Sequence, residues 1–463
     1  MCNAPQTFVK PFEGINMRVE RRNNMIAVMS SFFTRLVDRY LPDPLVFAII
    51  LTILTFLGGI ALTDTSAIEM VELWGDGYWG LLAFSMQMAL VVVTGHALAS
   101  TPLVRKWLSK IAALAKTPAQ GVMLVTFAAA LCSIINWGFG LVIGALFAKE
   151  VARRVPKVDY RLLIASAYIG FLTWHGGISG SIPLAASTPG NPMEAIAGII
   201  PLADTLLSPY NIFITGVLLV TLPFLCVKMM RPEDEIVAID PALLKEDPSM
   251  ERKLDPDATV AEKMEESRIL AYVMGALGGI YIVYYFMQGG AMDINIVNLL
   301  FITLGIILHG TPMAYMRAVK AAIGGTAGIL AQFPLYAGIQ LMMEHSGLGG
   351  LITEWFVNIS TEETFPILTF LSSGFINLAV PSGGGHWVVQ GPFVIPAAIE
   401  LGADVGKAAM AIAYGEAWMN MAQPFWALPA LAIAGLKARD IMGFCMMALL
   451  YSGIIFMVGL YFF

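Results

Sequence analysis

Charged residues are scarce in this 463-residue chain, at 13% of the sequence against 57% for hydrophobic residues. A soluble domain carries about 25% charged residues, so the composition excludes a soluble globular protein. Apolar runs of about 20 residues recur along the chain, and each is long enough to cross a bilayer as a helix. The composition therefore predicts an all-α polytopic membrane protein.

Cysteine is also scarce, and its spacing is uninformative about metals. The four cysteines lie far apart and form no CxxC pair or metal-type cluster, which is typical of small packing residues. We expect no metal site, no cofactor apart from a coupling ion, and no nucleic acid partner. The four are Cys2, Cys132, Cys226 and Cys445.

Basic residues are missing from one side of the predicted membrane. All but one of the 27 Lys and Arg residues, Lys407, fall in segments that the topology places in the cytoplasm. Under the positive-inside rule the N-terminal segment 1–43 is therefore cytoplasmic, in a multi-pass membrane protein. The predicted spans are 44–63, 79–99, 162–182, 210–230, 269–288, 295–309, 323–345, 408–432 and 441–461.

Two further apolar regions, 119–148 and 365–399, do not fit a single crossing. Basic residues flank the first on both sides, and acidic segments flank the second. Thirty residues of helix reach about 45 Å. Two crossings of the membrane need about 40 residues, so the first region is too short to cross twice. Each region is therefore predicted to be a re-entrant hairpin, the first entering from inside and the second from outside, with tips at INWGFG and PSGGGH.

The chain then divides into two halves of opposite orientation. Residues 44–230 contain the first hairpin and residues 269–463 the second, while the charged segment 231–268 reads as a cytoplasmic linker. In each half the span after the hairpin is interrupted by glycine and proline, within 171–192 and within 413–429, where Gly415 is one of the interruptions. Inverted repeats with broken helices are typical of secondary transporters, whose sites lie where the broken elements meet.

The polar residues at these breaks suit a small anion. Backbone N–H groups of Ser382, Gly383, Gly384 and Gly385 can form an anion-binding nest, and helix N-termini add partial positive charge. No Lys or Arg lies in these regions, which favours a monocarboxylate over a di- or tricarboxylate, and nearby aromatic residues suit a small apolar tail. The remaining substrate-binding candidates are Asn136, Trp137, Gly138, Ser179, His386 and Asn420, and the aromatic residues are Trp137, Trp174, Trp387, Trp418, Phe425 and Trp426.

An ionisable residue inside a span is a functional candidate, because its burial is costly. Glu416 is therefore predicted to carry a coupling proton or to help coordinate Na⁺. His175 is a second candidate proton carrier, and Asn377 could supply a carbonyl oxygen to a cation. Each of these residues also has a structural interpretation, as a hydrogen-bonding partner between helices.

Three long strings resemble the short-chain fatty acid transporters of the AtoE type, within the ion-transporter superfamily. They are SIINWGFGLVIGALFAKEVARR (133–154), TWHGGISGSIPLAASTPGN (173–191) and FINLAVPSGGGHWVVQGP (375–392). The resemblance covers nearly the whole chain. It implies uptake of butyrate- or acetoacetate-like acids across the inner membrane, an elevator motion of a transport domain against a scaffold, and a homodimer.

Three alternatives stay open at this point. The string Gly177-Ile178-Ser179-Gly180, with His175 nearby, matches a short GxSG hydrolase pattern, although it explains neither hairpin. A channel would need a continuous polar pore, whereas the polar residues cluster at the breaks. The third alternative is a transporter of another small solute, such as an amino acid derivative, or a cation/proton antiporter of the same superfamily.

Overall fold

The computed structural model describes residues 44–155, 157–231, 236–241, 258–290, 293–377, 380–423 and 425–463, which contain helices and connecting segments and no strand. The predicted N-terminal segment 1–43 and most of the predicted linker 231–268 lie outside the described residues. Seven helices among the described residues are long and apolar enough to cross a membrane. The predicted fold class, an all-α polytopic membrane protein, is confirmed.

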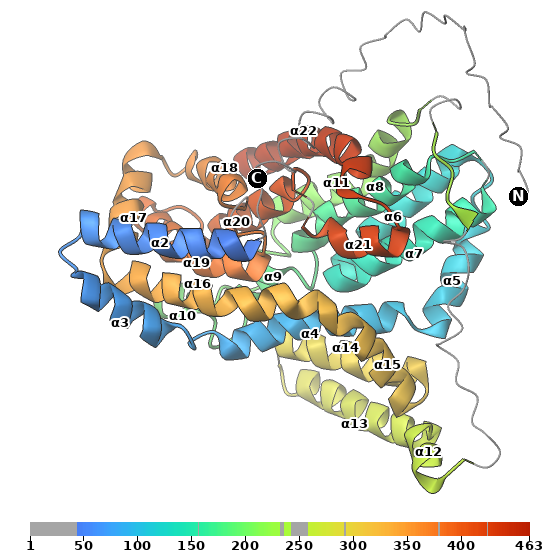
Figure 1. Cartoon of the computed structure of the whole chain (residues 1–463). Helices are drawn as coiled ribbons and strands as arrows, with labels where there is room; N and C mark the ends of the chain where they lie inside the picture. The colour runs from blue at the N-terminus through green and yellow to red at the C-terminus, as the bar shows by residue number, and fades with distance from the viewer. Residues whose placement is uncertain are drawn as a thin grey trace, which may run out of the picture.

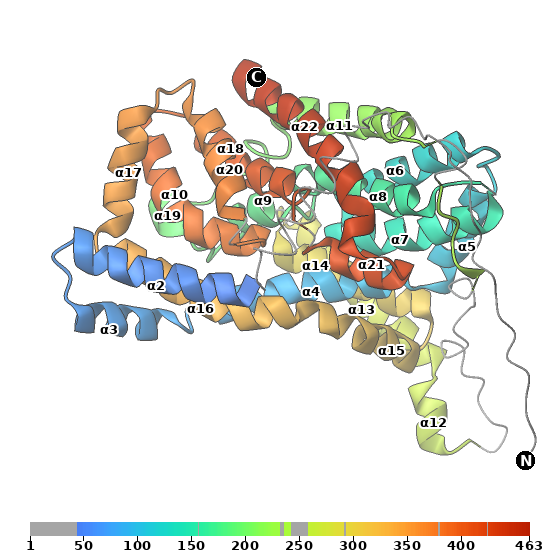
Figure 2. The same ribbon diagram turned by 45° about the horizontal axis from the view of Figure 1, so that its top comes forward.

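The helices follow one another in chain order (Figures 1 and 2). The first half contains α2 (Pro44–Leu62), α3 (Ala67–Gly77), α4 (Leu82–Ala99), α5 (Pro102–Ala112), α6 (Pro118–Ile135), α7 (Trp137–Arg154), α8 (Tyr160–Gly170), the 3₁₀ helix η1 (Phe171–Gly176), α9 (Ser181–Ala186), α10 (Glu194–Ala197) and α11 (Pro209–Lys228). The second half contains α12 (Val260–Glu265), α13 (Arg268–Met287), α14 (Ile294–His309), α15 (Pro312–Ala322), η4 (Ile323–Thr326), α16 (Ala327–His345), α17 (Leu348–Ile359), α18 (Phe365–Asn377), α19 (Gly383–Leu401), α20 (Val405–Met419), α21 (Ala427–Ala434) and α22 (Ala438–Phe462).

Several helices begin at a Thr-Pro or Ser-Pro pair, which explains where they start. The hydroxyl oxygen of the first residue accepts a hydrogen bond from the first helical turn, and proline fits the first helical position because its missing N–H is not needed there. Thr101, Thr117, Ser208 and Thr311 cap α5, α6, α11 and α15 in this way.

Two groups of helices pack against each other. We call α2–α4 and α13–α16 the panel, in which α16 packs on α2, α3 and α4, and α4 packs on α14. We call α6–α9, α11 and α18–α22 the hairpin body, in which α6 packs on α7, α8 and α11, and α20 packs on α18 and α19. The panel meets the hairpin body where α4 contacts α7 and α16 contacts α19.

Both predicted hairpins are present. Helices α6 and α7 form hairpin 1 (118–154), and α18 and α19 form hairpin 2 (365–401). The two hairpins lie on opposite sides of the molecule's centre in both views (Figures 1 and 2). Hairpin 1 is longer than the predicted 119–148, because its last turns stay helical beyond the apolar run and carry the ion pairs of Glu150 with Arg153 and Arg154.

Both predicted broken spans are also present, but one predicted break is wrong. The first break separates η1 from α9 at residues 177–180, and the second separates α20 from α21 at residues 420–426. Gly415 was expected to interrupt the second span, yet it lies inside α20. A side chain at Gly415 would meet the Phe370 carbonyl oxygen and Ser373 of α18. This glycine therefore lets α18 approach α20 closely.

The segments between the predicted spans and hairpins also contain helices. Residues 64–78, 101–117 and 346–364 carry α3, α5 and α17. The start of α3 is a capping box, in which the Ser66 N–H donates to Glu69 Oε2 at 2.7 Å and Ser66 Oγ accepts from the Glu69 N–H. The backbone hydrogen bond from Ser66 lowers the pKa of Glu69, because it stabilises the charged carboxylate.

Candidate functional site

Each hairpin tip is capped by a polar side chain at the start of its second helix. Asn136 caps α7, where its Oδ1 accepts from the Phe139 N–H at 2.9 Å, and Ser382 caps α19, where its Oγ accepts from the Gly385 N–H at 3.3 Å. Asn136 is fully buried and Ser382 is 7% exposed. Both helices therefore begin in the interior, with the positive end of the helix dipole at the tip.

The tip of hairpin 1 is bound to the first break. The Trp137 N–H donates to Ser179 Oγ at 2.9 Å, and the Ile178 N–H donates to the Ile134 carbonyl at 2.9 Å. Gly138 faces the panel, since a Cβ there would lie 3.2 Å from the Val91 carbonyl oxygen of α4. Ser179, a predicted substrate ligand, thus holds the tip in place.

The tip of hairpin 2 rests on the same break and on the panel. A Cβ at Gly383 would lie 2.8 Å from His175 Cε1 and 2.9 Å from Trp174 Cη2. At Gly384 the nearest atoms belong to Met88 and Phe333, and at Gly385 to Tyr336. The three glycines are therefore needed for close approach, and each faces a different neighbour.

A buried carboxylate lies at the centre of these elements. Glu416 Oε2 is 3.1 Å from His175 Nε2, and both side chains are 0% exposed. The Asn420 amide donates to Glu416 Oε1 at 3.0 Å, and the Asn377 amide donates to the Glu416 carbonyl oxygen at 3.0 Å and to Asn420 Oδ1 at 2.9 Å. The structure therefore brings together all three predicted ion-coupling residues and Asn420.

Two members of this network were missed by the sequence analysis. Gln423 donates to Asn420 Oδ1 at 2.7 Å, and the Tyr168 hydroxyl donates to the Asn420 carbonyl at 2.8 Å. Gln423 lies in the broken segment and is a polar residue within an apolar region. This pattern could have identified it as a site residue from the sequence. Tyr168 lies in α8, where its spacing resembles that of any packing residue. We call the set Glu416, His175, Asn377, Asn420 and Gln423 the junction.

His386 lies beside the junction but has a different partner. Its Nε2 is 3.0 Å from Ser373 Oγ, which donates to the Ile412 carbonyl at 2.6 Å. The predicted nest is also smaller than expected, because the Ser382 N–H donates to the Val380 carbonyl and the Gly385 N–H to Ser382 Oγ. Of the four predicted N–H groups, those of Gly383 and Gly384 have no hydrogen-bond acceptor among the described residues.

Three of the predicted aromatic residues form a cluster between the tips. The Trp137 ring lies 5.5 Å from that of Trp174 and 5.0 Å from that of Trp426, both edge-to-face. Trp174 thus contacts the tip of hairpin 1 through Trp137 and the tip of hairpin 2 at Gly383. Trp418 is elsewhere, since it packs on Phe370 and its indole N–H donates to the Leu449 carbonyl of α22.

One cavity lies beside the junction rather than in it. It has a volume of about 450 Å³ and lies between α4, α16 and the segment after α9. None of the predicted site residues lines it. The junction itself is closed in this structure, since its side chains are buried.

The comparisons agree over nearly the whole chain. The short chain fatty acid transporter family matches residues 25–463. Two relatives are named as candidate short-chain fatty acid transporters. One is an Escherichia coli K12 protein, 63% identical over 94% of this chain and 99% of its own. The other is a Haemophilus influenzae Rd protein, 62% identical over 95% of this chain and 100% of its own.

A solved structure supports the fold. The Alcanivorax borkumensis YdaH transporter superposes with a TM-score of 0.58 at 15% identity, over 91% of this chain and 97% of its own. The family is one of transporters and not of enzymes, so the GxSG string is no hydrolase motif. Ser179 instead accepts a hydrogen bond from the tip of hairpin 1. This chain belongs to the short chain fatty acid transporter family.

Proposed function

We propose that this protein is a secondary active transporter that carries short-chain monocarboxylates, such as butyrate or acetoacetate, with a proton across the inner membrane. The N-terminus is cytoplasmic, and the hairpin body moves against the panel in an elevator motion. The observation that carries the proposal is the buried pair of Glu416 and His175, 3.1 Å apart, beside the N-terminus of α19.

The coupling follows from the cost of burying charge. With one proton shared between them, Glu416 and His175 have no net charge. When that proton leaves, one negative charge remains in a region where both side chains are 0% exposed. An uncompensated buried charge costs several kcal/mol, so a substrate carboxylate, which would add a second negative charge, binds beside the pair readily only with the proton bound.

The substrate site lies beside this pair. The Gly383 and Gly384 N–H groups at the start of α19 suit one carboxylate, and Gly383 is in contact with the His175 ring. A monocarboxylate brings one negative charge and the coupling proton one positive charge. The transported unit is then neutral, which favours a one-to-one stoichiometry that does not respond to membrane potential.

Two alternatives lead to different measurements. Na⁺ could replace the proton, with amide oxygens of Asn136 and Asn377 as ligands, and another small carboxylate or an amino acid derivative could replace the fatty acid. The described residues of the junction and tips include no Lys or Arg, which disfavours di- and tricarboxylates because a second carboxylate would lack a cationic partner. A homodimer remains part of the proposal through the resemblance alone.

The test uses purified protein in proteoliposomes with labelled butyrate, under a pH gradient, a Na⁺ gradient or neither, and with unlabelled competitors. We expect accumulation with the pH gradient alone, unchanged when valinomycin and K⁺ clamp the potential. Glu416→Gln keeps the hydrogen bond from Asn420 but loses the exchangeable proton, so accumulation falls about tenfold or more while butyrate exchange persists.

The control is Glu354→Gln on the exposed side of α17, which leaves uptake unchanged. Accumulation by Glu416→Gln at the wild-type level removes the coupling role. Accumulation driven only by Na⁺ replaces the proton as the coupling ion, and the absence of butyrate uptake in every condition overturns the substrate.

A further inference from the structure

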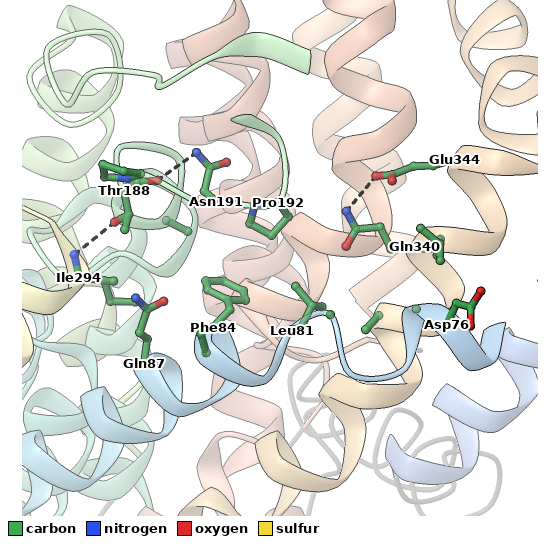
Figure 3. A pocket seen from close by; sticks show the side chains of 18 residues that line it. Asp76, Leu81, Phe84, Gln87, Thr188, Asn191, Pro192, Ile294, Gln340 and Glu344 are labelled. Atoms are coloured by element: carbon green, nitrogen blue, oxygen red, sulfur yellow. Dashed lines mark hydrogen bonds between the residues drawn. The ribbon is translucent and has the colours of Figure 1, made fainter. Parts of the chain in front are cut away.

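The cavity beside the junction has a defined position in the fold. Its walls are the first turns of α4, the last turns of α16, and the segment that follows α9 (Figure 3). Phe84 and Gln87 extend from α4, Gln340 and Glu344 from α16, and Asn191 belongs to the facing segment. At about 450 Å³ the cavity falls within the range of about 300–1,000 Å³ typical of small-molecule sites.

The cavity lies between the two bodies of the protein. Its α4 and α16 walls belong to the panel, whereas Ala185 lies in α9 of the hairpin body and Thr188 follows that helix. Across its inner edge the Ile294 N–H of α14 donates to Thr188 Oγ1 at 3.3 Å. A relative movement of the two bodies therefore changes the shape of this cavity directly.

One layer of aromatic side chains separates the cavity from the tip of hairpin 2. Phe84 lines the cavity, and its ring is 5.7 Å from that of Phe333. Phe333 in turn touches the tip, since a Cβ at Gly384 would lie 3.2 Å from Phe333 Cζ and 3.1 Å from Met88 Sδ. Phe333, Phe84 and Met88 are all buried, so this layer closes the direct path to the Gly384 N–H.

The charges that line the cavity are negative. Asp76 and Glu344 are its titratable side chains among the described residues, both are exposed, and Gln340 donates to Glu344 Oε1 at 2.8 Å. Like charges repel, so this lining disfavours a bare carboxylate and favours an acid that enters with its proton as a neutral molecule. The distribution of Lys and Arg along the sequence also predicts that this cavity lies on the outer side of the membrane.

We propose that this cavity is the outer vestibule of the transport path, that it admits a small monocarboxylic acid in neutral form, and that Phe333 with Phe84 forms the gate between the vestibule and the tip of hairpin 2. The inference rests on the proposed function for the identity of the ligand. The vestibule and gate themselves are tested by accessibility, without transport.

The vestibule is tested by cysteine labelling with a charged, membrane-impermeant methanethiosulfonate, added outside intact cells or to inside-out vesicles. Gln87→Cys lines the cavity, whereas the neighbouring Met86 is 53% exposed on the apolar surface and serves as the control, Met86→Cys. Because the reagent requires a hydrated thiol, Gln87→Cys is expected to react about tenfold faster than Met86→Cys from outside. Equal rates overturn the vestibule, and reaction only from the inner side overturns its outward position.

The gate is tested one layer deeper, at Met88→Cys. In an otherwise unchanged protein this thiol is expected to react slowly from outside, and in the double variant with Phe333→Ala about tenfold faster, because the aromatic layer is removed. Phe333→Leu keeps an apolar side chain at this position and disturbs the fold less, so the labelling rate with this variant is expected to lie between the other two rates. An unchanged rate in both double variants, with Gln87→Cys still reactive, overturns the gate.

The ligand is tested with butyrate in the same assay. Added butyrate is expected to slow labelling of Gln87→Cys more at low external pH, where the acid is neutral, than at neutral pH. Protection that is stronger at neutral pH overturns entry of the neutral acid. A failure of butyrate transport in proteoliposomes with the labelling pattern intact overturns the proposed substrate and leaves the vestibule and gate standing.

Discussion

The two hairpins are held together differently. In hairpin 1 small residues interlock: a Cβ at Gly140 of α7 would lie 2.6 Å from the Ser133 nitrogen of α6. In hairpin 2 polar side chains join the arms, as Ser373 with His386 at 3.0 Å, and Gln390 Nε2 donating to Ser372 Oγ at 3.1 Å. Hairpin 1 is therefore joined by close packing of small residues, whereas hydrogen bonds between polar side chains join the arms of hairpin 2.

The tips of the two hairpins also differ in the contacts that hold them. Trp137 and Ile134 at the tip of hairpin 1 are tied to their own half through Ser179 and Ile178. Gly383, Gly384 and Gly385 contact side chains of η1, α4 and α16 and place bare backbone against them. We infer that hairpin 1 contributes mainly stability and that hairpin 2 contributes mainly substrate binding. Three sets of substitutions test this division.

The largest effect on stability is expected from Gly140→Ala in hairpin 1. The new methyl group meets backbone atoms of Ser133, which cannot move aside as a flexible side chain can. Overpacking of this kind costs about 1–3 kcal/mol, so the midpoint of thermal unfolding in detergent falls. Gly216→Ala in α11 is the matched control, because nothing lies within 4 Å of a Cβ there. An unchanged midpoint for Gly140→Ala contradicts the packed character of hairpin 1.

The next effect is expected from Gly383→Ala in hairpin 2, and on uptake. The methyl group would meet the ring edges of His175 and Trp174, at the place proposed for the substrate carboxylate. Butyrate uptake is expected to fall about tenfold, which corresponds to about 1.4 kcal/mol, with a smaller loss of stability than for Gly140→Ala. Gly350→Ala in α17, where the space is open, is the control. A loss of stability with uptake retained reverses the division between the hairpins.

The smallest effects are expected from the two caps. Asn136→Ala and Ser382→Ala each remove the side-chain acceptor of a helix N-terminus, which costs about 1 kcal/mol. Asn136→Ser and Ser382→Thr keep an acceptor and are expected to restore stability. Butyrate uptake is then compared between Ser382→Thr and Asn136→Ser. A loss of uptake in only one of these conservative variants shows which tip has a role beyond capping. Equal loss of uptake in both conservative variants contradicts a division between the tips.

Much of the fold could be predicted from local sequence features. The hairpins followed from the length of two apolar runs and the charges beside them, and the breaks from glycine, proline and polar residues at apolar depth. The helices α3, α5 and α17 were not predicted, although the Ser66–Glu69 box and the Thr101-Pro102 pair mark two of their starts. The role of Gly415 was misassigned because a glycine that admits a neighbouring helix looks the same in sequence as one that breaks its own.

The sequence by itself determined that the chain lies in a membrane, how many elements are broken, and which polar residues stand in the breaks. Composition, periodicity and charge act over short stretches of chain, so each of these features can be read locally. The tertiary structure alone decided which of these residues meet. His175 and Glu416 are 241 residues apart and form one pair; Phe84 and Phe333 come from different halves and form one layer. Such contacts depend on how whole helices pack, and helix packing follows from side-chain shapes across the molecule, which no local pattern records.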